Sequence, residues 1–254
     1  MIAIPAPRRG VAGLGIFTVL ILALLLGLGV WQLQRRIQKH ALIAALTERL
    51  AASPGALPPA GQWSALTPAG DEFRRVSFSA TYEPGPDAMV YSSGSAVRTD
   101  ISGPGTWAFM PARLSGGETV VVNVGFVQNT MQDRALEDRA VTQLITGAPV
   151  TLTGYLRFPE SAGILTPQEN LGKRLWFTRD HMAMAQKLRW DQAGRIAPFY
   201  IDLESPVPSN GIPKPGPLEV QLRDDHLQYA ITWFGLAAAV MIAFGVWLFG
   251  QRRA

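Results

Sequence analysis

The residues best suited to chemistry lie at the beginning of a long uncharged stretch near the C-terminus. His226 precedes this stretch, and Tyr229 and Trp233 follow His226 by three and seven positions. On a helix these three side chains share one face. An imidazole can ligate haem iron and flat aromatic rings can flank a porphyrin, so His226 is a candidate haem iron ligand. The alternative is an interfacial belt, in which the three side chains only mark the depth of the lipid headgroups.

A second uncharged stretch, near the N-terminus, ends in residues that could complete such a site. Trp31 would supply another apolar wall, and Arg35 or Arg223 would pair with the haem propionates. Small residues recur at every fourth position in both stretches, at Ala23 and Gly27 in the first and at Gly235, Ala239 and Ala243 in the second. Such stripes allow helix backbones to approach closely in lipid. We therefore expect an antiparallel helix pair that brings Trp31, Gln32 and Arg35 close to His226 and its two aromatic neighbours.

Other kinds of chemistry have little support. The chain contains no cysteine, which excludes a disulfide scaffold, a cysteine-ligated metal centre and thiol catalysis. The G-x-S-x-G, H-E-x-x-H and P-loop motifs do not occur, and no spacing supports a Ser–Lys hydrolase. We expect His40 to be a solvated residue and His181 to be a surface or helix-capping residue. The residues alone therefore indicate no catalytic site.

The two uncharged stretches, Gly10–Gln34 and Leu227–Gln251, are long enough to cross a membrane. As helices they extend about 37 Å, which exceeds the roughly 30 Å of a hydrocarbon core. We therefore expect transmembrane helices over residues 10–34 and 226–251. A cleaved signal peptide is the alternative for the first stretch, but signal peptides have a shorter apolar core and a small-residue cleavage site.

The net charge of +4 belongs to the two ends of the chain. Basic and acidic residues balance between the two stretches, and the surplus consists of Arg8, Arg9, Arg252 and Arg253. A nucleic-acid-binding protein would carry its excess charge on the folded domain, so no nucleic-acid partner is expected. Arginines on short tails favour cytoplasmic ends, although four basic residues also flank the stretches on the domain side. We expect cytoplasmic tails at 1–9 and 252–254, and an outer domain at 35–225 in a periplasm or an equivalent space.

Short apolar segments separated by glycine-rich turns predict strands in the outer domain. Apolar and polar residues alternate over 76–82 and over 150–158, so each of these strands has one wet face. Thr119–Val127 is apolar on both faces, which is typical of a central strand. Trp107–Leu114 and Ile196–Leu203 are further candidates. The predicted fold is a membrane-anchored α+β protein, with an antiparallel β-rich domain that is barrel- or sandwich-like and has one or two helices.

Four local features complete the domain. An amphipathic helix is expected over residues 31–52, ended by Ser53-Pro54-Gly55. Asp180 can cap a short helix over 181–188. Residues 205–217 contain five prolines and should form an extended tether rather than a strand. Gly125, within the central strand, is interpreted as relieving backbone crowding.

Seven short blocks of the sequence form a pattern in a fixed order: Gly29–Arg36, Phe73–Val76, Val121–Val127, Gly154–Arg157, Trp176–Ala183, Ala197–Asp202 and His226–Ala237. Together they resemble the surfeit-locus (Surf/Shy) family of cytochrome c oxidase assembly proteins. The last block is the most specific, and the order of the blocks between two terminal spans strengthens the resemblance. Val124 and Asp225 depart from the family pattern, which usually has arginine and asparagine there. A carboxylate beside His226 favours the imidazolium form, which cannot ligate iron, whereas the helix N–H groups oppose it.

The resemblance implies a non-catalytic assembly factor that assists insertion of haem a into subunit I of cytochrome c oxidase. The factor would bind haem a at the outer membrane face, with His226 as the important residue. The implied partners are subunit I, other oxidase assembly factors and membrane lipid. The implied location is a bacterial inner membrane, crossed twice, with the large domain in the periplasm. The alternatives are a cofactor-free chaperone that holds subunit I ready for insertion, and a membrane-anchored periplasmic hydrolase.

Overall fold

The computed structural model of the chain describes residues 9–95, 97–128, 139–190, 195–219 and 224–253. The chain divides into two compact units, one made from its two ends (residues 1–44 and 222–254) and one from its middle (residues 45–221). Arg8 and Arg223, which the sequence analysis singled out, lie outside the described residues.

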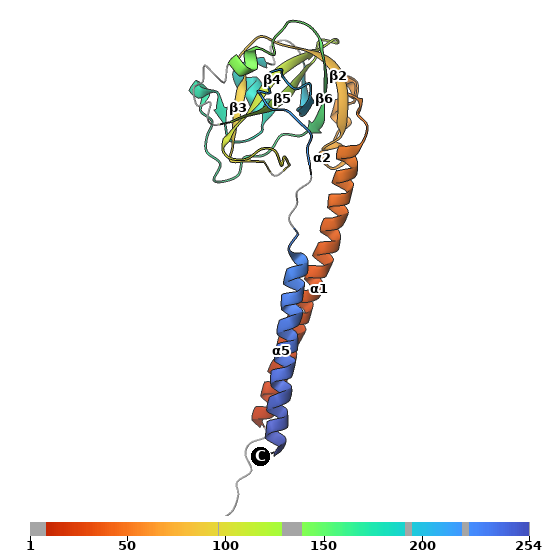
Figure 1. The fold of residues 1–254 in the computed structure, drawn as a ribbon, viewed down its shortest axis with the longest axis vertical. Coiled ribbons are helices and arrows are strands. Elements are labelled where there is room, and N and C mark those ends of the chain that lie inside the picture. Colours follow the sequence, from red (N-terminus) through yellow and green to blue (C-terminus); the bar gives the residue numbers. More distant parts are fainter. Residues whose placement is uncertain (1–8, 96, 129–138, 191–194, 220–223, 254) are drawn as a thin grey trace, which may run out of the picture. The chain divides into compact units, whose positions relative to one another are not determined.

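Two long helices form the first unit. α1 (Arg9–Ala51), which continues into the second unit, and α5 (His226–Arg253) run antiparallel beside each other (Figure 1). Both helices are long and apolar enough to cross a membrane, as the sequence predicts. Large apolar side chains such as Ile16, Phe17 and Ile242 are exposed on them. Because such a surface is unfavourable in water, it favours anchoring in a membrane.

α1 is continuous from the predicted span into the predicted amphipathic segment. It ends at Ala51, just before the Ser53-Pro54-Gly55 stop that the sequence predicts. Within the apolar part, the hydroxyl of Thr18 donates to the carbonyl of Leu14 at 2.8 Å. This bond satisfies a polar group that would otherwise be costly among apolar neighbours.

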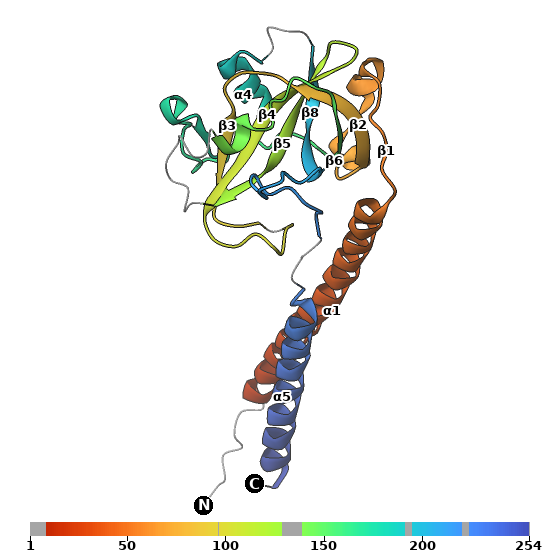
Figure 2. The same cartoon turned by 45° about the horizontal axis from the view of Figure 1, so that its top comes forward.

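One eight-stranded sheet organises the second unit (Figures 1 and 2). Its strands are β1 (Gly55–Ala56), β2 (Arg75–Tyr82), β3 (Ala88–Ser92), β4 (Gly105–Leu114), β5 (Thr119–Gln128), β6 (Val150–Arg157), β7 (Leu175–Trp176) and β8 (Ile196–Ser205). Neighbours follow the order β1-β2-β6-β8-β5-β4-β3-β7, and β2 also pairs with β4. The five strands that the sequence predicts are confirmed, with β5 buried between β4 and β8.

The predicted antiparallel pairing is confirmed only in part. β5 pairs antiparallel with β4 but parallel with β8, and the β1–β2 and β3–β7 pairs are also parallel. The described strands belong to one mixed sheet rather than to an antiparallel one. Parallel neighbours need a long crossover, and here the chain forms β6 and β7 between β5 and β8. Alternation along a strand identifies the strand but not its neighbour.

Short helices accompany the sheet in the described part of the chain. They include η1 (Ala60–Ala65), α2 (Pro68–Asp71), η2 (Leu171–Lys173) and α4 (His181–Leu188). α4 has the predicted bounds. The side chain of Asp180 accepts a hydrogen bond from the amide of Ala183 at 3.0 Å, which is the predicted cap.

Two adjacent residues of β8 show how both faces of the sheet are filled. Phe199 and Tyr200 are fully buried and point to opposite faces, because successive residues of a strand alternate. The ring of Phe199 packs edge-on against Trp63 of η1, with centroids 5.5 Å apart. The ring of Tyr200 lies 5.6 Å from that of His181, so α4 covers the other face (Figure 2).

The wet face predicted for β6 is covered towards the end of the strand, although Thr151 at its beginning is exposed. Tyr155 and Arg157 were expected on that face, yet they are only 2% and 8% exposed. Tyr155 packs with Leu50 from the end of α1 and with Leu218 from beyond β8. Segments that are distant in the sequence therefore cover a face that was expected to be in solvent because of its polar residues.

The proline-rich segment after β8 docks on the sheet. It forms no regular strand, as predicted, but Lys214 forms an antiparallel bridge with Phe126 of β5. Their N–H···O distances are 3.0 and 2.8 Å. Gly125, next to Phe126, has φ +131°, and a Cβ there would lie 2.5 Å from the nitrogen of Pro215. Gly125 thus permits a close backbone approach, which confirms its predicted role.

Candidate functional site

The two helices of the first unit meet through small residues, but not through the predicted ones. Gly29 is buried, and a Cβ there would lie 2.5 Å from the ring of Phe234. Ala230 and Ala237 on α5 are also buried. The predicted stripes are wrong, because exposed positions include Ala23, Gly27, Gly235, Ala239 and Ala243. Both helices have small residues on more than one face, and the ring of Phe234 fits the notch at Gly29.

His226, the first residue of α5, contacts α1. Its Nδ1 lies 2.7 Å from Oε1 of Gln32, and the Gln32 side chain is buried. The expectation that Gln32 comes close to His226 is therefore confirmed. The backbone amide of His226 donates to Oδ1 of Asp224 at 3.1 Å, which satisfies one of the N–H groups left open at a helix start.

Asp224 also links His226 to α1. Its Oδ2 lies 2.6 Å from Nε2 of His40 and 3.7 Å from Nε of Arg36. Desolvation raises the pKa of Asp224, but the hydrogen bonds from the His226 amide and the His40 ring outweigh it, so the pKa is lowered overall. His40 is exposed, as expected for a solvated residue, and in addition it holds this carboxylate.

The other predicted site residues lie on the surface of the helix pair. Trp31 and Tyr229 are 49% and 55% exposed, and Trp233 is half-buried. Arg35 is exposed, with its guanidinium carbon 6.0 Å from the centre of the Trp31 ring. Aromatic and cationic side chains are therefore available on the helices that position His226.

The donor set suits a haem better than a bare metal ion. Within the described residues, no three His, Cys, Asp or Glu side chains are grouped closely enough to hold an ion. A haem iron needs fewer ligands from the protein, because the porphyrin supplies four nitrogens and one imidazole is enough. His226 supplies one imidazole of this kind, on a helix that also carries aromatic side chains.

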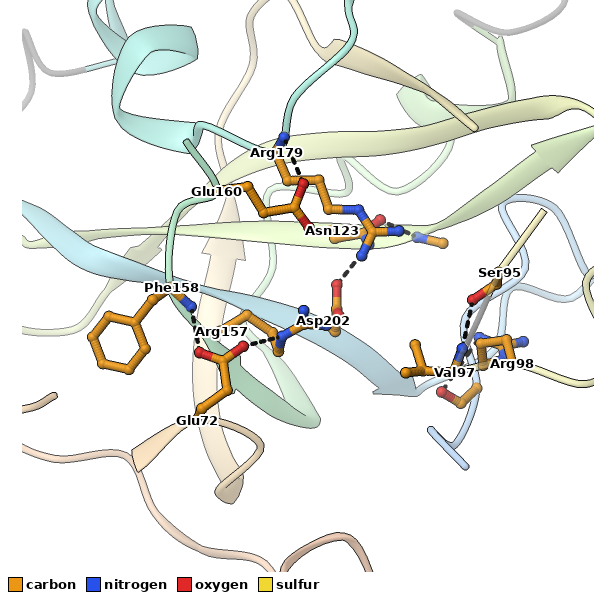
Figure 3. Close-up of polar contacts among 12 residues, drawn as sticks. Glu72, Ser95, Val97, Arg98, Asn123, Arg157, Phe158, Glu160, Arg179 and Asp202 are labelled. Atoms are coloured by element: carbon orange, nitrogen blue, oxygen red, sulfur yellow. Dashed lines mark hydrogen bonds and ion pairs between the residues drawn. The ribbon is translucent and has the colours of Figure 1, made fainter. Parts of the chain in front are cut away.

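A second polar cluster is buried in the other unit (Figure 3). Arg157 of β6 forms ion pairs of 2.6 Å with both Glu72 and Asp202. Asp202 also accepts a 2.7 Å hydrogen bond from Asn123, whose own oxygen accepts from the amide of Gly125 at 3.3 Å. Because these groups satisfy one another, the cluster is suited to joining β5, β6 and β8 rather than to binding a ligand.

The sequence aligns with a known family over nearly its whole length. A model of the SURF1 family matches residues 19–238, a range that contains both Gln32 and His226. The chain belongs to the SURF1 family. Surfeit locus protein 1 of Rattus norvegicus is 31% identical over 88% of this chain and 72% of its own. The SURF1-like protein of Monosiga brevicollis is 30% identical over 89% and 83%, and Surfeit locus protein 1 of Takifugu rubripes is 29% identical over 88% and 92%.

Sequence reasoning on this SURF1 family member located Gln32 and His226 but missed the residues around them. Asp224 was not singled out, and Arg157 was assigned to a solvated face. One signal was available for the buried cluster. Asp202 is a charged residue inside the otherwise apolar run Phe199–Leu203, and a carboxylate buried in a strand requires a partner.

His181 corrects another expectation for this SURF1 family member. It is fully buried rather than on the surface, because the first turn of α4 packs on β8. Its Nε2 lies 3.0 Å from the carbonyl oxygen of Ala197, and a carbonyl only accepts, so Nε2 carries the proton. Burial lowers the pKa of His181 to about 4, although the Ala197 bond and Asp180 act in the opposite direction.

We expect the stability of the SURF1 domain to depend on pH through His181. Because its folded pKa of about 4 is below the ordinary value of 6.5, the unfolded chain binds more protons between these values. The contribution is complete above pH 6.5 and decreases as the pH falls towards 4, by about 3 kcal/mol. Denaturant unfolding followed by tryptophan fluorescence at several pH values measures this slope. The His181→Phe variant should flatten it, and an equal slope in the variant would contradict the assignment.

Proposed function

We propose that this protein is a membrane-anchored, non-catalytic assembly factor for haem-copper cytochrome c oxidase. In this proposal it assists insertion of haem a into subunit I and binds the haem through His226 at the outer face of the membrane. The chain crosses a bacterial inner membrane twice and holds its large domain in the periplasm. The observation that carries the proposal is the 2.7 Å contact of His226 Nδ1 with Gln32, which leaves the second ring nitrogen for iron.

Helical geometry supports a flat aromatic surface beside this imidazole. At about 100° per residue, Trp31 and Arg35 are rotated backwards from Gln32, by roughly 100° and 60°. Tyr229 is rotated backwards from His226 by roughly 60°. In an antiparallel pair, rotation in the same sense about each axis leads to the same flank. We therefore expect Trp31, Arg35 and Tyr229 to share one flank at the level of the contact.

Each of these residues has a role toward haem a, which is cargo here rather than a resident cofactor. His226 binds the iron, and the rings of Trp31, Tyr229 and Trp233 cover the apolar porphyrin. Arg35 pairs with a propionate. No proton or electron transfer is required of the protein, in agreement with a non-catalytic role.

Purification of the full-length protein from cells that make haem a tests the proposal. We expect the absorption spectrum of haem a in the purified protein, and a loss of at least about tenfold in occupancy in the His226→Ala variant. His40→Ala is the matched control, since His40 is bonded to the same Asp224 but is not the proposed ligand. Unchanged occupancy in His226→Ala would remove His226 as the ligand.

An apolar surface on the domain favours a second candidate, the cofactor-free chaperone. Ile164 and Leu165 are fully exposed and, with Tyr91 and Phe177, line an open hollow of about 980 Å³. Exposed apolar patches of this kind often bind proteins, and subunit I would be the partner. Purified protein that retains subunit I but never contains haem a would favour this candidate.

A further inference from the structure

The contact between His226 and Gln32 also determines which nitrogen of the imidazole ring carries the hydrogen. The atom of Gln32 that faces Nδ1 is the carboxamide oxygen, at 2.7 Å, and a carboxamide oxygen only accepts hydrogen bonds. Nδ1 must therefore donate, which means that the ring carries its hydrogen on Nδ1. A neutral imidazole has one donor and one acceptor nitrogen, so the lone pair is on Nε2.

We propose that Gln32 is a positioning residue that fixes His226 in the Nδ1–H tautomer and so reserves Nε2 for iron. The inference rests on the proposed function for its purpose, although the tautomer itself is a property of the haem-free protein. A partner on the second ring nitrogen sets both the tautomer and the orientation of a ligating histidine. Because Gln32 is buried in the helix pair, its oxygen is held in place without a contribution from the haem.

The carboxylate of Asp224, two residues before His226, bonds groups other than the imidazole ring. Asp224 accepts from the backbone amide of His226 through Oδ1 and contacts His40 through Oδ2. Nδ1 of His226 is thus bonded to a neutral amide, which orients the ring without adding a negative charge to it. Gln32 is suited to the task because it provides an acceptor and a fixed geometry at once.

The three histidines of the chain make the tautomer measurable. Nε2 of His181 donates to the carbonyl of Ala197, and Nε2 of His40 faces a carboxylate oxygen. His226 is therefore expected in one tautomer and His181 in the other. Full-length, haem-free protein labelled with ¹⁵N-histidine in lipid nanodiscs, at mildly alkaline pH, distinguishes the protonated from the unprotonated ring nitrogen by chemical shift.

Two substitutions of Gln32 separate positioning from simple packing. Gln32→Leu removes the acceptor, and we expect His226 to lose its uniform Nδ1–H signal and its affinity for added haem a to fall about tenfold. Gln32→Glu keeps an oxygen acceptor and should retain the Nδ1–H signal. Gln34→Leu is the matched control, because Gln34 is an exposed glutamine two residues along the same helix.

The outcomes distinguish this inference from the function on which it rests. Nε2–H on His226 in the unmodified protein, or an Nδ1–H signal that survives Gln32→Leu, would overturn the role of Gln32. A correct tautomer in protein that takes up no haem a would support that role and refute haem binding. Loss of the signal in Gln34→Leu as well would overturn the specific assignment to Gln32.

Discussion

Replacing Arg157 with methionine is expected to destabilise the domain by about 3–5 kcal/mol, because it leaves the buried carboxylate of Asp202 and the partly buried carboxylate of Glu72 without their cation. Arg157 is only 8% exposed and pairs with Asp202 and Glu72, each at 2.6 Å. Burial opposes its charge, but the attraction of Asp202, with smaller contributions from Tyr200 and Glu72, raises its pKa above the ordinary value. Its guanidinium carbon also lies 4.5 Å from the centre of the Phe73 ring. Denaturant unfolding of the purified protein measures the loss.

A matched arginine isolates the effect of burial. Arg74 forms a 3.6 Å ion pair with Asp71, three residues away, and its side chain is exposed. Arg74→Met should therefore cost no more than about 1 kcal/mol. Neutralising the partners as well, with Asp202→Asn and Glu72→Gln in the Arg157→Met background, should recover part of the loss. If Arg157→Met and Arg74→Met cost the same, the buried pairs do not stabilise the domain.

The predictable part of the fold was encoded in short segments. α4 was predicted with its bounds because Asp180 caps the following turn, and β5 was predicted because its residues are apolar on both faces. The positions of these elements depend on contacts made within a few residues. The parallel pairing of β5 with β8 depends on the long crossover formed by the chain between these two strands. No local sequence pattern determines this pairing.

The candidate site was predictable where one side chain had few possible partners. His226 lies at the start of an apolar stretch, and an antiparallel hairpin brings it to the level of Gln32. The rotation of the helices was not predictable, because it depends on the fit of Phe234 against Gly29 rather than on a stripe of small residues. Arg157 and His181 were placed on the surface for a related reason, since polarity alone does not show which distant segment covers a side chain.

Replacing Gly125 with alanine is expected to cost about 3–5 kcal/mol, because the new Cβ meets backbone atoms that cannot move independently. The Cβ would lie 2.5 Å from the nitrogen of Pro215, and the φ of +131° is itself unfavourable for alanine. Removing this clash requires the proline-rich segment after β8 to separate from β5. That separation breaks both hydrogen bonds between Phe126 and Lys214. It also removes the carbonyl oxygen of Pro215 from the buried guanidinium of Arg98, which donates to it at 3.2 Å.

Gly117→Ala separates the crowding from the backbone strain. Gly117 also has a positive φ, +93°, but a Cβ there would have no neighbour within 4 Å. We expect this control to show only the strain, about 1–2 kcal/mol. Hydrogen exchange at the amides of Phe126 and Lys214 should accelerate in Gly125→Ala and stay unchanged in Gly117→Ala. Equal costs in the two variants, with slow exchange at both amides, would mean that the docked segment adjusts to the new Cβ without separating from β5. Glycine would then be required at position 125 only for its backbone conformation.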